Sequence, residues 1–304
     1  MKGIIIVNRS GFSAQEYQAR RIEEELSALG VSTETISDGY RLFGIKDGKC
    51  HGFSAGEKPD FAVFLDKDKY LAELLTAYGI RLFNRAEAIK LCDDKGETCI
   101  ALANSGLKMP DTVFAPLCYK KDETSVKIAK ETADCAARRL GFPLVVKESY
   151  GSMGTGVMLA ENATELEKIS LETANKPHLY QQYLSARKGT DVRVIVIGGK
   201  VASAMERHNP SDFRSNLALG GTGKEIALSD EFAEAAERAA KILKLDYCGV
   251  DLLYGDSGEP YICEVNSNAF FKGSESVTHK NIAKLYAAHI INCINNENNP
   301  NNAN

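Results

Sequence analysis

Hydrophobic and polar residues follow one another over residues 1–92 in the order expected of a small α/β domain. The run Gly3–Val7 is continuously apolar and β-branched, which predicts a buried strand. A helical period follows over Ala14–Leu29, and Gly30 stands where a C-terminal cap is expected. The same pattern predicts further strands at Val31–Ile36, Phe61–Leu65 and Ile80–Phe83 and a helix at Lys69–Tyr78. This alternation predicts a doubly wound domain.

The pattern changes to an α+β style beyond Cys92. Helices are expected up to Ala103, at Ser125–Leu140 and at Glu231–Leu243. Two pairs of strands, each joined by a turn, are expected at Leu144–Lys147 with Gly156–Ala160 and at Gly249–Tyr254 with Tyr261–Val265. Residues 295–304 are polar and rich in Asn, which predicts a disordered tail.

Composition narrows the functional classes. The 304 residues are 44% hydrophobic and carry a formal net charge of -4, so a general nucleic-acid-binding protein is not expected. The eight cysteines never form a C-x-x-C pair, and we expect reduced thiols rather than a zinc or redox site. The apolar start is far shorter than a membrane span, so neither a signal peptide nor an anchor is expected. Cytoplasm is the expected compartment.

The last predicted strand pair carries a possible metal site. Asp251 and Glu264 lie in adjacent strands, and Glu264 and Asn266 are two residues apart and therefore share a face. Oxygen donors of this kind suit magnesium in a nucleotide site. Acids that simply face solvent would give the same pattern, although the apolar neighbours Val250 and Ile262 make a fully solvated position less attractive.

Basic residues and glycines in the second half of the chain suggest another site, which would bind anions. Lys147 ends an apolar strand, and a loop with Gly151, Gly154 and Gly156 follows it, as in a flap whose backbone approaches phosphates. A merely mobile turn is the alternative. Arginines at positions 193, 207 and 214 would form a clamp for carboxylates or phosphates, or else ordinary surface salt bridges. His208 alone is more typical of a loop histidine than of a base.

These motifs occur in one order that resembles the ATP-grasp fold, and more closely the RimK-type glutamate ligases. The matching segments are Lys147 with its glycine loop, Gln181–Leu184, Glu206–Arg207, Asp212–Asn216, Gly249–Asp251 and Glu264–Asn266. The resemblance covers roughly residues 94–291. It implies a pre-ATP-grasp domain over 1–92 and an ATP-grasp domain over 93–294, with a lid at about 110–184 and a catalytic part at about 185–294.

The resemblance also implies a role for each matching residue. ATP and Mg²⁺ (or Mn²⁺) would be the cofactors, with Asp251, Glu264 and Asn266 as metal ligands. The expected ATP contacts are Lys95, Lys147, Gln182, Tyr183, Leu184, Asp191, Arg214 and Asn216. Lys147, Arg207 and Arg214 would counter the negative charge that develops during catalysis. Gln182 departs from relatives, which often have an acidic residue at this adenine hinge, although backbone groups can still read the base.

The implied activity is amide-bond formation through an acylphosphate. The expected partners are an amino acid, glutamate or another, and a carboxylate on a small molecule, peptide or protein, with no membrane partner and with self-association into a homo-oligomer. Two alternatives stay open: an ATP-grasp ligase that joins free amino acids or modifies a ribosomal peptide, and a non-catalytic nucleotide-binding regulator. The intact set of Asp251, Glu264, Asn266, Lys147 and Arg214 argues against the regulator.

Overall fold

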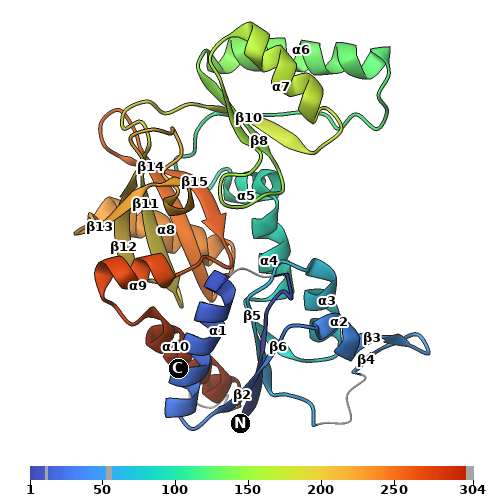
Figure 1. Cartoon of the computed structure of the whole chain (residues 1–304), viewed down its shortest axis with the longest axis vertical. Coiled ribbons are helices and arrows are strands. Elements are labelled where there is room, and N and C mark those ends of the chain that lie inside the picture. The colour runs from blue at the N-terminus through green and yellow to red at the C-terminus, as the bar shows by residue number, and fades with distance from the viewer. Residues whose placement is uncertain (11–12, 53–56, 299–304) are drawn as a thin grey trace.

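The computed structural model describes residues 1–10, 13–52 and 57–298. Three sheets follow one another along the longest axis of the molecule, with the N-terminal sheet at one end and the sheet that carries α6 and α7 at the other (Figure 1). Among the described residues, no helix is both long and apolar enough to cross a membrane.

The N-terminal domain is a four-stranded parallel sheet in the order β2-β1-β5-β6. Ile4 and Ile6 of its central strand β1 pack on one face, and Ile5 and Val7 pack on the other, so both faces are buried as in other parallel sheets. Its elements are β1 (Lys2–Ile6), α1 (Ser13–Ala28), β2 (Ser32–Ile36), α2 (Gly39–Leu42), β3 (Phe43–Lys46), β4 (Lys49–Gly52), β5 (Phe61–Phe64), α3 (Lys69–Ala77), β6 (Arg81–Phe83) and α4 (Ala86–Asp93). The predicted elements are confirmed, whereas α2, the β3–β4 hairpin and α4 were not foreseen.

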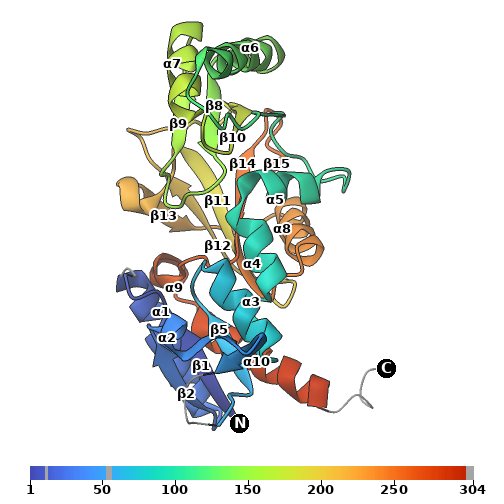
Figure 2. The same cartoon turned by 90° about the vertical axis from the view of Figure 1, so that its right-hand side faces the viewer.

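The lid is a four-stranded antiparallel sheet in the order β7-β10-β8-β9, with α6 and α7 packed on its outer side (Figure 2). The hairpin expected around the glycine loop is present as β8 and β9, whereas α7 was not predicted. The elements from the connection onward are α5 (Lys95–Leu102), β7 (Thr112–Phe114), α6 (Glu123–Leu140), β8 (Leu144–Glu148), β9 (Val157–Ala160), α7 (Ala163–Thr173) and β10 (His178–Gln182).

The third sheet is five-stranded and antiparallel, in the order β13-β12-β11-β14-β15. It forms the floor beneath the lid, and α8 packs on its far side through alanines such as Ala236 and Ala239. Its elements are β11 (Thr190–Ile197), β12 (Lys200–His208), the 3₁₀ turn η1 (Leu217–Leu219), β13 (Thr222–Glu225), α8 (Asp230–Ile242), β14 (Tyr247–Tyr254), β15 (Pro260–Asn266), α9 (Lys272–Thr278) and α10 (Ile282–Asn298).

The last helix, α10, returns to the N-terminal domain. Its buried residues Tyr286 and Ile290 join the same apolar cluster as Ile5 of β1 and Ile22 of α1, and α1 and α10 lie side by side. The helix continues to Asn298, four residues into the segment 295–304 that was expected to be disordered. Packing of Ile294 and an ion pair of 3.2 Å between Arg81 and Glu297 extend the helix against its polar composition. Residues 299–304 lie outside the described residues.

Ile290→Ala tests whether α10 is an integral part of the N-terminal core. Ile290 is fully buried, so the cavity should lower the free energy of unfolding by roughly 2–5 kcal/mol, as measured by urea denaturation. Leu285→Ala, on the exposed side of the same helix, is the control and should change the free energy of unfolding by less than about 0.5 kcal/mol. Equal losses in the two variants would contradict this packing.

Candidate active site

A pocket lies between the lid sheet and the floor sheet. The lid contributes β8, the glycine loop and the end of β10, and the floor contributes β11, β12, β14, β15 and the loop before η1. Of the residues predicted from the sequence, the pocket is lined by Lys95, Lys147, Gln182, Tyr183, Leu184, Asp191, Arg207, Arg214, Asn216, Asp251 and Glu264. The structure therefore brings together residues that are far apart in the chain.

Asn266, predicted as a metal ligand, does not line this pocket, and neither does Arg193 of the predicted clamp. Both line an adjoining pocket of about 620 Å³, which shares Ser152, Arg207, Asn216 and Glu264 with the first pocket. The shared residues mark the boundary between the two cavities. Glu264 faces both of them, so a group bound at Glu264 and Asn266 would stand between the two compartments.

The register of β14 and β15 explains why Asp251 and Glu264 are neighbours. Asp251 pairs with Glu264, but the next pair is Leu252 with Ile262, so Cys263 is the extra residue of a β-bulge. Both Cys263 and Glu264 consequently line the pocket, although adjacent strand residues normally point to opposite faces. The predicted common face of Asp251 and Glu264 is confirmed, and the bulge was not foreseen.

Asp251 is almost completely buried between two arginines. Arg193 of β11 donates to both of its carboxylate oxygens, one contact being 2.7 Å, and Arg207 Nη2 of β12 lies 3.1 Å from Oδ2. Burial by itself would raise the pKa of Asp251, but the two guanidinium groups outweigh it and lower the pKa below its usual value. Asp251 is thus an ionised carboxylate at neutral pH.

Arg207 extends this network to a second acid. Its Nε donates to Asp191 Oδ1 at 2.8 Å, and its Nη2 approaches Asp191 Oδ2 at 2.5 Å. Arg207 itself is only 4% exposed, so the guanidinium is held between Asp191 and Asp251 with little freedom to move. This is a buried network, not the set of surface salt bridges that the sequence left open as an alternative.

The donor set Asp251, Glu264 and Asn266 fits a divalent cation. The Glu264 side chain makes no hydrogen bond within the described residues, and its ion pair there is with Lys95 Nζ at 3.7 Å; the Asn266 side chain is likewise without a partner in those residues. Both therefore keep oxygen lone pairs for a ligand. A carboxylate has about four lone-pair sites, so Asp251 retains acceptor capacity beside its arginines.

Three cations border the glycine loop. Lys147 is buried in β8, and its Nζ lies 3.6 Å from Cys263 Sγ. Burial works to lower the pKa of Lys147, but Cys263 and Glu264 outweigh it and raise the pKa, so the ammonium stays charged. Lys95 Nζ donates to Gly151 O at 2.9 Å, and Arg214 Nη1 donates to Gly154 O at 2.9 Å. These two contacts hold the loop over the pocket.

Part of the pocket lining is apolar and aromatic. Tyr183, just after β10, packs edge-on against Phe213 with a centroid distance of 6.3 Å. Its buried hydroxyl has no hydrogen-bond partner among the described residues, which leaves it available to a ligand. The backbone N–H of Gln182 already donates to Asp111 O at 2.8 Å, so the end of β10 is held in place by the residue just before β7.

Sequence reasoning missed several lining residues. Asn8, Asp66 and Lys67 of the N-terminal domain and Lys272 line the adjoining pocket, together with Arg193 of the predicted clamp. The polar residues that follow β1 and β5 were the available signal, because ligands bind beyond the carboxyl ends of parallel strands. His208 lines neither pocket; it is exposed, and its Nδ1 lies 2.8 Å from Thr190 Oγ1.

Comparisons with known proteins agree with this geometry. The model of the RimK-like ATP-grasp domain matches residues 92–291. The chain belongs to the RimK-like ATP-grasp family. It is 36% identical over 224 residues to human beta-citrylglutamate synthase B, which covers 73% of this chain but 56% of that protein. The chain thus spans little more than half the length of that relative.

Two further matches cover nearly the whole chain. A probable alpha-L-glutamate ligase from Psychromonas ingrahamii is 32% identical over 297 residues, covering 93% of this chain and 92% of the relative. The structure of the ATP-grasp ligase PsnB, complexed with a phosphomimetic variant of its minimal precursor, Mg and ADP, superposes with a TM-score of 0.67. That match has 18% identity and covers 95% of this chain and 97% of the other, and it shows that the two share the ATP-grasp fold.

Asp251→Asn tests the buried network. Removing the charge leaves Arg193 and Arg207 without full compensation, so the free energy of unfolding should fall by roughly 3–5 kcal/mol in urea denaturation at neutral pH. Asp256→Asn, on the exposed turn between β14 and β15, removes the same charge and should change it by less than about 0.5 kcal/mol.

The difference in stability between the native protein and Asp251→Asn should depend on pH. The pKa of Asp251 is lowered in the folded state from 3.8, so its stabilising effect is complete above that pH and is lost as the pH falls through the folded value. The stability gap between the native protein and Asp251→Asn should stay constant near neutrality and close only in acid below pH 3.8. A gap that closes near neutral pH would contradict the lowered pKa.

Proposed function

We propose that this protein is an ATP-dependent ligase that joins a carboxylate to an amine through an acylphosphate. The arrangement that supports this proposal is the pair of connected pockets, with Glu264 and Arg207 at their boundary. A nucleotide in one pocket would place its terminal phosphate beside a carboxylate in the other.

The proposed reaction has two steps. A carboxylate oxygen attacks the γ-phosphorus of ATP, and the bond to the β–γ bridging oxygen breaks, giving an acylphosphate and ADP. The amine nitrogen then attacks the acyl carbon, phosphate leaves, and the nitrogen loses a proton, giving the amide. Neither step needs a covalent bond to the protein, so catalysis depends on positioning and on charge neutralisation.

The residues of the pocket suit these tasks. Lys95 and Lys147 would contact ATP phosphates, and Arg214 and Asn216 would act beside them from the loop before η1. Arg207 and Arg214 would counter the charge that develops on the transferred phosphoryl group. Lys95 and Arg214 also hold the glycine loop, which would keep water from the acylphosphate.

The nucleoside would occupy the other end of the cleft. Gln182, Tyr183 and Leu184 would border the adenine, with the free Tyr183 hydroxyl as an additional polar contact. Asp191 would lie near the ribose. Mg²⁺ or Mn²⁺, held by Asp251, Glu264 and Asn266, would supply charge neutralisation between phosphate oxygens.

The adjoining pocket suits a substrate that carries charges of both signs. Arg193, Lys67 and Lys272 supply cations for carboxylates, and Asp66 supplies an anion for an ammonium group. The names of the relatives, a beta-citrylglutamate synthase and a probable alpha-L-glutamate ligase, support glutamate as the amino acid. The second substrate would be a small-molecule, peptide or protein carboxylate.

Phosphate release from ATP tests the proposed reaction. With Mg²⁺ present, release should depend on a particular pair of amine and carboxylate, and mass spectrometry should detect the amide formed from that pair. Glutamate and the other amino acids are offered singly, in pairs and with carboxylate acceptors. ATP that binds but is never consumed under any pairing would contradict the ligase and favour the nucleotide-binding regulator.

Glu264→Gln tests the metal ligands separately. Loss of one carboxylate should lower Mg²⁺-dependent turnover on the order of 10²-fold and raise the Mg²⁺ concentration required for half-maximal activity. The free energy of unfolding should hardly change, because the Glu264 side chain makes no hydrogen bond among the described residues. Glu259→Gln, which removes a carboxylate from the turn just before β15, should leave the Mg²⁺ requirement unchanged. Identical Mg²⁺ titrations for both variants would contradict the assignment.

A further inference from the structure

A second charged pocket lies at the opposite end of β11 from the nucleotide cleft. It is bordered by the β11–β12 turn, the end of α8, the start of β14 and α10, and its volume of about 760 Å³ lies within the range of small-molecule sites. The strand rises about 3.3 Å per residue, so Asp191 in the cleft and Ile197 near this pocket are roughly 20 Å apart. A ligand here would not touch the reacting groups.

The lining of this pocket is strongly basic in a chain whose formal net charge is -4. Its cations are Arg81, Arg85, Lys200, Arg238, Lys241 and Lys244, whereas its carboxylates are Glu237 and Asp246. Cations gathered around one cavity in an acidic protein raise the local potential for anions.

Part of this charge is already compensated. Lys200 Nζ lies 2.9 Å from Glu237 Oε2, and Arg238 donates to Ser105 O at 2.6 Å and lies 3.4 Å from Glu234. In contrast, Arg85, Lys241 and Lys244 are exposed and carry no ion pair within residues 1–10, 13–52 and 57–298. These unpaired side chains give the pocket its excess of positive charge.

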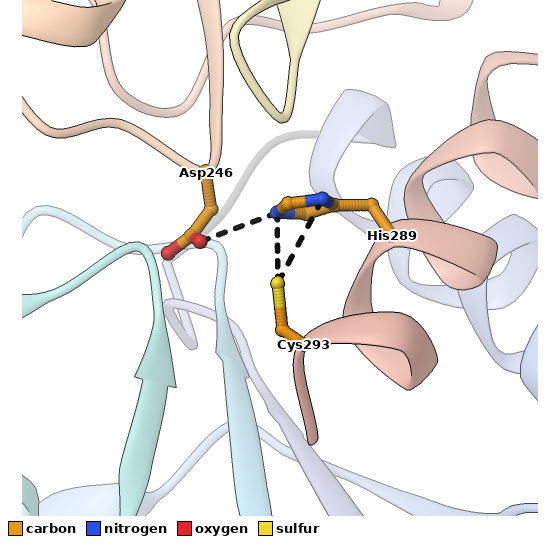
Figure 3. Close-up of side chains that lie close together, drawn as sticks. All are labelled: Asp246, His289 and Cys293. Carbon is orange, nitrogen blue, oxygen red and sulfur yellow. Dashed lines mark hydrogen bonds and ion pairs between the residues drawn. The ribbon is translucent and has the colours of Figure 1, made fainter. Parts of the chain in front are cut away.

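Asp246, His289 and Cys293 form a side-chain cluster at the edge of this pocket (Figure 3). His289 Nε2 lies 3.2 Å from Asp246 Oδ1 and 3.5 Å from Cys293 Sγ, a spacing that would suit a metal ion. However, Arg81 Nη2 lies 3.1 Å from Asp246 Oδ1 and 3.2 Å from Oδ2. A guanidinium thus already contacts both oxygens of the single carboxylate in this cluster, whereas the donor set in the cleft also includes Glu264, whose side chain makes no hydrogen bond among the described residues.

The protonation of His289 also argues against a metal ion in this cluster. Burial works to lower its pKa, but the hydrogen bonds with Asp246 and Cys293 outweigh burial and raise the pKa of His289 to about 9. An imidazolium has no lone pair for a metal. Asp246 and Glu297 together balance the positive charges of Arg81 and His289, so this edge of the pocket adds little net charge.

We propose that this pocket binds a compact small-molecule polyanion. The Arg85, Lys241 and Lys244 side chains, which have no ion pair among the described residues, suit a ligand with several negative charges within a few ångströms. Linked phosphates and a tricarboxylate both have this chemistry, and arginine and lysine bind either one through charge-assisted hydrogen bonds.

The test is calorimetric titration of the whole protein with tripolyphosphate and, separately, with citrate in metal-free buffer. Arg85→Gln/Lys241→Gln should weaken binding of the tighter ligand at least about tenfold, because two of the unpaired cations are lost. Both side chains are exposed, so the variant should fold, as circular dichroism would verify. The tighter of the two ligands identifies the phosphate or carboxylate source.

Lys120→Gln/Lys121→Gln is the matched control, since it removes the same charge from an exposed segment before α6. It should change the affinity less than about threefold, which separates a local site from the general effect of net charge. Both variants leave the nucleotide cleft intact, so any binding there contributes equally to both titrations. Equal weakening in both variants, no weakening in either, or no binding of either anion to the native protein would overturn the proposal, whatever the outcome of the ligase assay.

Discussion

The buried contact of Asp251 with Arg193 and Arg207 organises the part of the floor sheet that lines the pocket. The three residues come from the neighbouring strands β14, β11 and β12, and Arg207 continues the network to Asp191. Burying these charges is unfavourable unless each has a partner, so the side chains are held in one arrangement. The contacts that offset the burial of these charges also place the ionised carboxylate of Asp251 beside Glu264.

The lid and the floor are connected through the cations that a nucleotide would need. Lys95 and Arg214 donate to carbonyl groups of the glycine loop, whereas Lys147 reaches from β8 toward the bulged strand β15. The contacts of Arg214 and Lys147 cross from one sheet to the other. If the glycine loop moves, Lys95 and Arg214 must lose their carbonyl partners in it. The position of the loop is therefore coupled to the position of these two positive charges in the cleft.

The N-terminal domain is tied to the remainder by both packing and polar contacts. α10 completes one face of its parallel sheet, and Asn84, after β6, exchanges hydrogen bonds with the backbone at Asp246 and Tyr247. The Asn268 side chain donates to the backbone of Leu65. The carboxyl ends of β1 and β5 are thereby fixed against the end of β15, which is why Asp66 and Lys67 share a pocket with Asn266.

Several elements, and several residues that line the cleft, could be predicted from local patterns in the sequence. Local hydrophobic periods predicted β1, α1, β8 and β14, and the pairing of β14 with β15 followed from a short turn, so Asp251 and Glu264 could be placed together before the structure was known. Lys147 was recognisable from its strand and glycine loop. These are short-range signals, because strand period and turn length act over few residues.

Which residues from distant parts of the chain come into contact depends on the tertiary packing, and local patterns in the sequence do not predict it. The bulge at Cys263, the docking of α10 on α1 and the contribution of Asp66 and Lys67 to the adjoining pocket all depend on packing between segments far apart in the chain. The same holds for the basic pocket, whose cations come from β6, the following loop, β12 and α8. No local pattern encodes such convergence, since each lysine or arginine alone has the sequence context of an ordinary surface residue.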